Sequence, residues 1–465
     1  MRGRVWCYYM AKGKYVNSIT EGVIWKQLLI FAVPLLMSNL FQQLYTTIDS
    51  VVVGRYVSSQ ALAAVGSTGS LCGLMVGFFV GLSTGAGVII SQYYGARDNE
   101  NLHKAVHTAI GLSIAAGLIL TVVGLILTPT LLRLMNTPDD VFDLAVVYLR
   151  IYFAGILSLT IYNMGAGILR AIGDSRRPLY YLIISAVINV VLNMVFVCVF
   201  NWGVAGVAWA TIIAQVITAV LVLINLISAT EGYRLELKKI RIHGATFKKI
   251  LKIGIPAGFQ SVVVSLSNTV IQAQINSFGS DVMAGLSAAG RIDGFIYMPI
   301  NAFGLAMTTF VGQNIGAGKP DRVRKGVKIC LLMSMGVTIG FGALIYIFTH
   351  QLLGIISSSE IVIHYGAIMV HLMAATYWIF VIAETLSGVI RGSGESLVPM
   401  IIYICGMCAF RLIWVLVVTP IWQDIRAVIW CYPASWTFTS LAFIIYYFKG
   451  NWLRKHEEKL KKVNV

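Results

Sequence analysis

One acidic residue in a long apolar segment is the first candidate for chemistry in this chain. Asp49 is the single carboxylate of the apolar run 28–57, which is long enough to cross a bilayer as a helix. Tyr45 lies four residues earlier, so both side chains fall on one face of that helix. A charge inside a bilayer costs roughly 2.5–3.5 kcal/mol on insertion scales, so an intramembrane acid indicates a functional site.

Polar residues recur at the same spacing in two later apolar runs. Asn189 and Asn193 are four residues apart in one run, and Thr211 and Gln215 are four apart in the next. A carboxylate, two amide oxygens and a hydroxyl are the ligands that hard cations prefer. We therefore expect Asp49, Asn189, Asn193 and Thr211 to form a cation site. The alternative is that the amides only join helices by hydrogen bonds.

The second half of the chain has a different polar set. Glu384 and Arg411 each lie within an apolar run, and opposite charges inside a membrane usually pair. An ion pair between them is therefore one interpretation, and a Glu384 that faces a cavity and meets cationic substrate is the other. Arg291 and Asp293 are expected to form a local pair or to line the mouth of a cavity.

The composition shows which kind of fold must position these residues. The chain has 465 residues, of which 58% are hydrophobic and 12% charged, and its mean hydropathy is +0.80. These values predict an all-α polytopic membrane protein, and the strand alternation of a membrane barrel is absent. Charged and Gly/Pro-rich breaks divide the chain into twelve predicted spans, at about 24–53, 60–91, 105–129, 141–169, 178–200, 204–229, 249–277, 282–313, 327–349, 361–390, 398–419 and 426–448.

The positions of Lys and Arg in the chain show what the net charge of +16 means. Lys and Arg concentrate in alternate loops and in both tails, which is the positive-inside pattern, so we expect a cell-membrane protein with both termini in the cytoplasm. This placement argues against a nucleic-acid partner. The seven cysteines have no metal spacing, and the chain lacks a nucleophile elbow or a Walker loop, so an enzyme is not expected. Met10 is a candidate start of the native protein.

The two halves of the chain repeat. The segment that begins SQYYGAR at Ser91 matches the one that begins GQNIGAG at Gly312, and the segment GAGILRAIGD at Gly165 matches LSGVIRGSGE at Leu386 with the same offset in residue number. Pro34 matches Pro256 with an offset one position greater. Six spans per repeat predict two lobes related by a pseudo-two-fold axis along the membrane normal. The predicted divisions are a tail (1–23), an N-lobe (24–230), a linker (231–248), a C-lobe (249–448) and a basic tail (449–465).

Glycines form a stripe in the second predicted span. Gly69, Gly73, Gly77, Gly81 and Gly85 recur every fourth residue and share one helix face. Such a stripe allows the backbone of a neighbouring helix to approach closely. We expect packing rather than a ligand site.

Several motifs, in order, resemble the multidrug and toxic compound extrusion (MATE) transporters of the multidrug/oligosaccharidyl-lipid/polysaccharide flippase superfamily. They are Pro34 with Asp49-Ser-Val-Val-Val-Gly, the Gln92-Tyr-Tyr-Gly-Ala loop and its twin, the LRAIGD segment 169–174 and its twin, and MPINAFG at 298–304. The resemblance covers about residues 19–448. It implies two six-helix lobes in a V shape that export organic cations in exchange for Na⁺ or H⁺, with no other cofactor.

The resemblance also implies roles for individual residues. Asp49 matches the carboxylate that binds the coupling ion, Asn189 and Thr211 match two of its partners, and Tyr45 matches the aromatic residue one turn away. Asn193 stands where several members have an aspartate, which leaves the identity of the ion, Na⁺ or H⁺, open. Glu384 resembles the tenth-helix acid of related sequences. The expected substrate cavity includes Gln42, Tyr162, Asn163, Glu384 and Arg411.

We expect a monomeric secondary antiporter in contact with membrane lipid. A lipid-linked oligosaccharide flippase of the same superfamily is the alternative, although it would have more helices and a more basic cavity. A carrier of the major facilitator type also has twelve helices, but the basic signature of its loop between spans two and three is absent.

Overall fold

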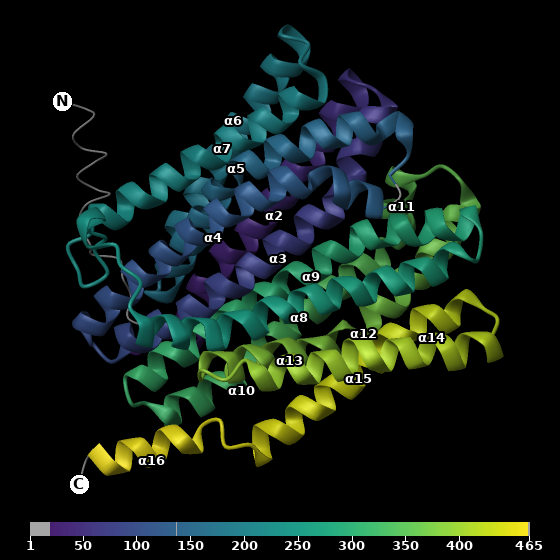
Figure 1. Ribbon diagram of the computed structural model, residues 1–465. Coiled ribbons are helices and arrows are strands. Elements are labelled where there is room, and N and C mark those ends of the chain that lie inside the picture. Colours follow the sequence, from purple (N-terminus) through teal and green to yellow (C-terminus); the bar gives the residue numbers. More distant parts are fainter. Residues whose placement is uncertain (1–18, 136, 464–465) are drawn as a thin grey trace. The chain divides into compact units, whose positions relative to one another are not determined.

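The computed structural model describes residues 19–135 and 137–463, and these are helical with short connections (Figure 1). In chain order the elements are α2 (Ile24–Tyr56), α3 (Ser59–Gly95), α4 (Asn99–Leu134), α5 (Asp139–Ala171), α6 (Arg176–Met194), η1 (Val195–Val199), α7 (Gly203–Ile227), η2 (Leu237–Lys239), α8 (Gly244–Asn276), α9 (Ser280–Gly316), α10 (Pro320–Ile347), α11 (Thr349–Ile356), α12 (Glu360–Gly392), α13 (Leu397–Tyr403), η3 (Ile404–Ala409), α14 (Phe410–Ile421), α15 (Ile425–Lys449) and α16 (Arg454–Val463).

Twelve of the described segments are long and apolar enough to cross a membrane. The predicted class, an all-α polytopic membrane protein with twelve spans, is therefore confirmed. The fifth and eleventh spans each contain a π-helix, η1 and η3, which the apolar pattern did not predict. Such π-bulges occur frequently at functional sites, and η1 directly follows the helix that carries both asparagines.

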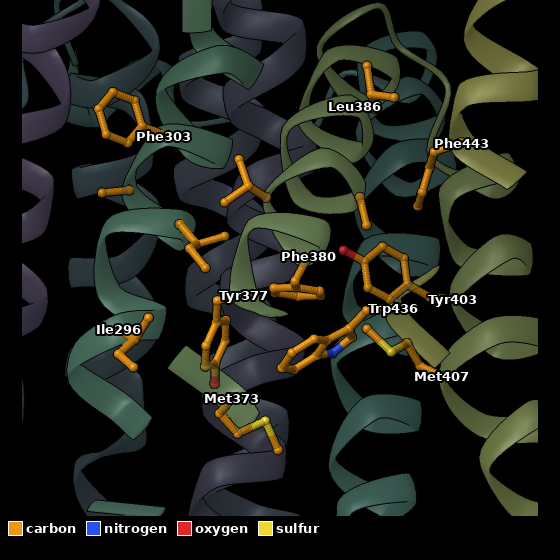
Figure 2. Close-up of a cluster of buried hydrophobic side chains, with 14 of the residues drawn as sticks. Ile296, Phe303, Met373, Tyr377, Phe380, Leu386, Tyr403, Met407, Trp436 and Phe443 are labelled. Atoms are coloured by element: carbon orange, nitrogen blue, oxygen red, sulfur yellow. The ribbon is translucent and has the colours of Figure 1, made fainter. Parts of the chain in front are cut away.

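The chain divides into two compact units. Of the described residues, unit 1 holds 37–135 and 137–254, and unit 2 holds 19–36 and 255–463. In unit 1, α5 packs against α3, α4 and α7, and in unit 2, α12 packs against α9, α10 and α15. Figure 2 shows part of the core of unit 2, where Tyr377 and Phe380 of α12 lie beside Trp436 of α15.

The helix bounds follow the internal repeat of the sequence. Helices α3 and α9 begin at Ser59 and Ser280 and end at Gly95 and Gly316, so the offset between them is the same at both ends. Helices α5 and α12 begin and end with that same offset. Each unit thus has an equivalent central helix, α5 or α12, surrounded by equivalent neighbours.

The boundary between the units differs from the predicted division of the chain. It falls within α2 and within α8, close to Pro34 and Pro256, rather than in the linker. Apolar side chains explain the difference, because Leu28 and Phe31 at the start of α2 belong to the core of unit 2. The predicted linker 231–248 is also shorter in the structure, since α8 already begins at Gly244.

The segment that leads to α8 packs against unit 1. Tyr233 and Leu235 are buried in its core, and both ring nitrogens of His107 lie within 3.2 Å of backbone oxygens, those of His103 and Glu236. The basic segment that leads to α8 is therefore packed in a defined conformation within unit 1.

Candidate functional site

The C-terminal part of α2 meets η1 and α7 in unit 1 through β-branched residues. Val52 and Val53 of α2 form one buried cluster with Val197 of η1 and with Val204 and Val207 of α7. Valine is stiff at χ1 and packs closely, so the cluster holds the three segments in one register. Asp49 lies one turn before these valines, and α6 carries its asparagines just before η1.

This packing brings the four predicted cation ligands together. Asn193 Nδ2 donates to Asp49 Oδ1 at 2.5 Å and to Asn189 Oδ1 at 3.0 Å. Asn189 Nδ2 lies 3.4 Å from Thr211 Oγ1, whose hydroxyl donates to the Val207 carbonyl. Asn189 and Asn193 are fully buried, and Thr211 and Asp49 are 5% and 9% exposed. The result is a continuous buried chain of polar groups that ends at a carboxylate.

The charge of Asp49 is not balanced by a basic side chain. Among the described residues, no Lys, Arg or His forms an ion pair with it. Asn193 Oδ1, beside it, is buried and has no hydrogen-bond partner. A buried carboxylate next to an unpaired carbonyl oxygen is costly in apolar surroundings unless a cation or a proton completes the group.

The other predicted residues of unit 1 lie in varied surroundings. Tyr45 interacts with Asp49 and with the Thr211 hydroxyl, and Gln42 is exposed. Asn163 of α5 donates to its own helix at Leu159, and its carbonyl accepts a hydrogen bond from Ser83.

Tyr162, the neighbour of Asn163 on α5, reaches the Pro178 carbonyl at 3.4 Å. The structure therefore brings Tyr45 to the Asp49 site. The place of Gln42, Tyr162 and Asn163 in a substrate cavity stays a prediction.

Glu384 in unit 2 has partners that the sequence interpretation missed. Tyr403 of α13 donates to Glu384 Oε2 at 2.6 Å, and Arg391 Nη2, on the same helix as Glu384, lies 3.8 Å from Oε1. The ion pair of Glu384 with Arg411 that the sequence suggested is therefore wrong. Arg391 lies seven residues after Glu384, or two helical turns, and this spacing was the available signal.

Arg411 is buried in unit 2 without a carboxylate. Its Nε donates to Ser435 Oγ at 3.0 Å, its Nη1 donates to Asn268 Oδ1 at 3.0 Å, and its guanidinium carbon lies 4.8 Å from the centre of the Tyr432 ring. Two neutral acceptors and an aromatic face thus take the role that an acid was expected to play. Its predicted place in a substrate cavity stays untested.

The expected local pair of Arg291 and Asp293 does not form among the described residues. Asp293 lies beside Tyr377, and its Oδ1 is buried without a hydrogen-bond partner, whereas Arg291 is exposed. The reason is geometric, because residues two apart on a helix point to different faces.

Among the described residues, twelve helices of membrane length in two repeated units, with a buried acid beside two amides, define a polytopic membrane protein with a buried polar site. The family model described as MatE matches residues 34–195 and 256–416. These residues make up more than half of the chain, so the chain belongs to the MatE family.

Curated relatives and solved structures agree with this family. A probable multidrug resistance protein of Bacillus subtilis, YoeA, is 29% identical over 94% of this chain and 96% of its own length. The probable multidrug resistance protein NorM of Thermotoga maritima is 24% identical over 92% and 93%. A crystal structure of a MATE protein in a bent conformation has 22% identity and a TM-score of 0.87, covering 97% of this chain and 99% of that one.

Proposed function

We propose that this chain is a cation-coupled antiporter that exports small organic cations from the cell. The chain is similar over nearly its whole length to probable multidrug resistance proteins, and export of small molecules is a function that fits that name. Two repeated units are the architecture in which alternating access operates. In this mechanism, one ligand favours the inward-open arrangement and the other favours the outward-open one.

The single observation that carries the coupling proposal is the state of Asp49. It is buried, has no basic partner among the described residues, and lies beside the unpaired Asn193 Oδ1. A carboxylate with a permanent basic neighbour would be neutralised in every state of a transport cycle. Asp49 instead needs an exchangeable positive charge, which is what a coupling ion supplies.

Both candidate ions fit the groups present. A proton would bind the carboxyl of Asp49 and leave the amide chain as it is. A Na⁺ ion would be held by oxygens of Asp49, Asn189, Asn193 and Thr211, and the Asn193 amide would have to turn its oxygen toward Asp49. The oxygen and nitrogen of an amide are assigned from their hydrogen bonds, so this rotation changes donors and acceptors but not shape.

The orientation that we propose places both termini in the cytoplasm of a cell-membrane protein. It rests on the concentration of Lys and Arg in alternate connections and at the adjoining helix ends, as in residues 234–252. Asp49 lies late in a helix that would start in the cytoplasm, so the ion would reach it from outside. Entry of the ion would then favour release of the substrate.

The test is efflux of a fluorescent organic cation from proteoliposomes in which a Na⁺ gradient and a proton gradient are imposed separately. We expect one gradient to drive efflux and the other to have little effect. Asp49→Asn should abolish the driven component while the protein inserts normally, and Thr46→Ala is the matched control, because Thr46 lies on the same helix and donates only to backbone carbonyls of its own turn. Full gradient-driven efflux by Asp49→Asn would refute the assignment.

A further inference from the structure

A polar hollow lies in unit 1, away from the Asp49 site. It has a volume of about 430 Å³, within the range of small-ligand pockets. Asn101 and Lys104 from the start of α4 form one wall, and residues 241–246, which lead into α8, form the other. The wall 241–246 is held in place where the His243 backbone N–H donates to Thr108 Oγ1 at 3.2 Å.

The internal repeat explains why this hollow exists. Arg322 of α10 is the repeat equivalent of Asn101, and the segment before α2 is the equivalent of residues 241–244, with Gly22 matching Gly244. In unit 2, the Arg322 guanidinium donates to the carbonyls of Ile19, Glu21 and Gly22 and so fills the equivalent place.

Asn101 is shorter than Arg322, and its side chain bonds to the residue that caps its own helix. Its side-chain amide donates to Asp98 Oδ2 at 2.7 Å, and Asp98 also caps the start of α4. The space that a guanidinium fills in unit 2 is therefore left open in unit 1.

The charges around the hollow favour an anion. Arg241 and His243 line it, and neither side chain bonds to another described residue. Lys104 also lines it and forms an ion pair with Glu100 at 2.5 Å, so the charge of Glu100 is already balanced. The first turn of α8 contributes no acidic residue.

A buried hydroxyl completes the lining. Thr246 is 5% exposed and borders the hollow, and its hydroxyl makes no hydrogen bond with another described residue. Gly244 and Ala245 also line the hollow, and the first amides of an α-helix have no acceptor within the helix. A hydroxyl, backbone amides and a guanidinium are the groups that bind phosphate oxygens.

We propose that this hollow binds a phosphate group, with the Arg241 guanidinium opposite its charge and the His243 ring, the Thr246 hydroxyl and the first amides of α8 as further donors. Two sources share this chemistry, a phospholipid headgroup and a free phosphate compound. Basic pockets at the cytoplasmic ends of membrane helices suit anionic headgroups. Only the lipid source depends on the orientation proposed above, and the site itself is independent of the transport function.

The repeat supplies a test that separates a shaped pocket from a basic surface. Asn101→Arg should place a guanidinium in the hollow as Arg322 does in unit 2. If phosphate binds in a shaped pocket, Asn101→Arg blocks the pocket and weakens binding although it adds positive charge. If phosphate binds only to a basic surface, the added charge strengthens binding. Thr246→Val removes the hydroxyl and keeps the volume of the side chain. Arg241→Gln removes one charge.

Binding is measured on the full-length protein in two arms, with inorganic phosphate in detergent and with phosphatidylglycerol in phosphatidylcholine nanodiscs. We expect Asn101→Arg and Arg241→Gln each to lower affinity at least tenfold in the arm that the wild type binds, and Thr246→Val to lower it several-fold. Binding in both arms indicates any phosphate, and binding only in the nanodiscs indicates a headgroup.

Unchanged or tighter binding by Asn101→Arg, with the wild-type melting temperature, would overturn the proposal. So would a wild type that binds neither probe. Gradient-driven efflux, measured on the same variants, should stay at the wild-type level, so failure of this site and failure of the transport proposal are distinguishable.

Discussion

Replacing Asn193 by leucine tests how the amide shell controls the charge of Asp49. Asn193 Nδ2 donates to Asp49 Oδ1 at 2.5 Å, and leucine has the same number and branching of side-chain heavy atoms but no donor. A hydrogen bond to a charged group contributes about 1.5–3 kcal/mol. At about 1.36 kcal/mol per pH unit, its loss corresponds to about one to two pH units.

The direction of the change follows from which form loses a partner. The charged carboxylate of Asp49 is less stable without the Asn193 donor, so Asp49 keeps its proton to a higher pH. The pH at which efflux is half-maximal should therefore rise by about one to two units. The direction is the same for Na⁺ coupling, because Na⁺ needs the deprotonated carboxylate and competes with the proton.

The assay is the pH dependence of efflux in proteoliposomes at a fixed Na⁺ concentration. Ser185→Ala is the matched control, because Ser185 lies two turns earlier on α6 and also makes a helix-joining hydrogen bond, to the Ala214 carbonyl at 3.2 Å. It should leave the pH midpoint unchanged. An Asn193→Leu protein that transports with the wild-type midpoint would refute the reasoning, because the amide would then have no influence on Asp49.

Two further predictions concern stability. Gly85→Ala should lower the free energy of unfolding by about 1–3 kcal/mol, since its Cβ would lie 2.4 Å from the Gly254 backbone nitrogen, while Gly69→Ala, with open space around it, should leave the melting temperature unchanged. Equal melting temperatures for both variants would contradict this packing. Burial raises the pKa of the Glu395 carboxyl, but the ion pair with Lys455 at 2.7 Å and other hydrogen bonds outweigh that effect and hold the pKa below its ordinary value of 4.5. The contact therefore stabilises the C-terminal segment fully above pH 4.5, and this stabilisation is lost as the pH falls through the lower pKa of the folded state. In the wild type, hydrogen exchange in residues 451–463 should therefore increase as the pH falls through that lower pKa. Glu395→Gln should remove this pH dependence.

The helical fold and its repeat could be predicted because both depend on local patterns. Apolar runs of membrane length give the twelve spans, and matching motifs at a constant offset in residue number show the duplication. The gathering of Asp49, Asn189, Asn193 and Thr211 was also predictable in part. Spacing by four put both asparagines on one face, and their cost in an apolar helix required partners.

What the patterns did not predict depends on contacts between distant segments. Glu384 and Arg411 have opposite charges, but they do not pair with each other. Glu384 accepts a hydrogen bond from Tyr403, and Arg411 donates one to Asn268; neither partner carries a charge that would identify it in the sequence. The glycine stripe predicted close packing against a neighbouring helix. The structure has it at Gly85 and leaves Gly69 with open space, because a stripe shows which face is bare but not where a neighbour crosses it.

The boundary between the two units was also beyond the sequence patterns. The basic linker is the longest polar interruption, and it was the natural place to divide the chain. The first turns of α2 instead contribute Leu28 and Phe31 to the core of unit 2. Only the packing contacts of those side chains in the structure reveal that the start of α2 belongs to unit 2.

The central claim is that Asp49 exchanges the coupling ion during transport. The most direct measurement is ion entry into proteoliposomes, as ²²Na⁺ uptake or internal acidification, at the moment when an organic cation is exported. We predict stoichiometric ion entry with the wild-type protein and none with Asp49→Asn. Ion entry that continues at the wild-type ratio in Asp49→Asn would contradict the claim and move the coupling site elsewhere in the chain.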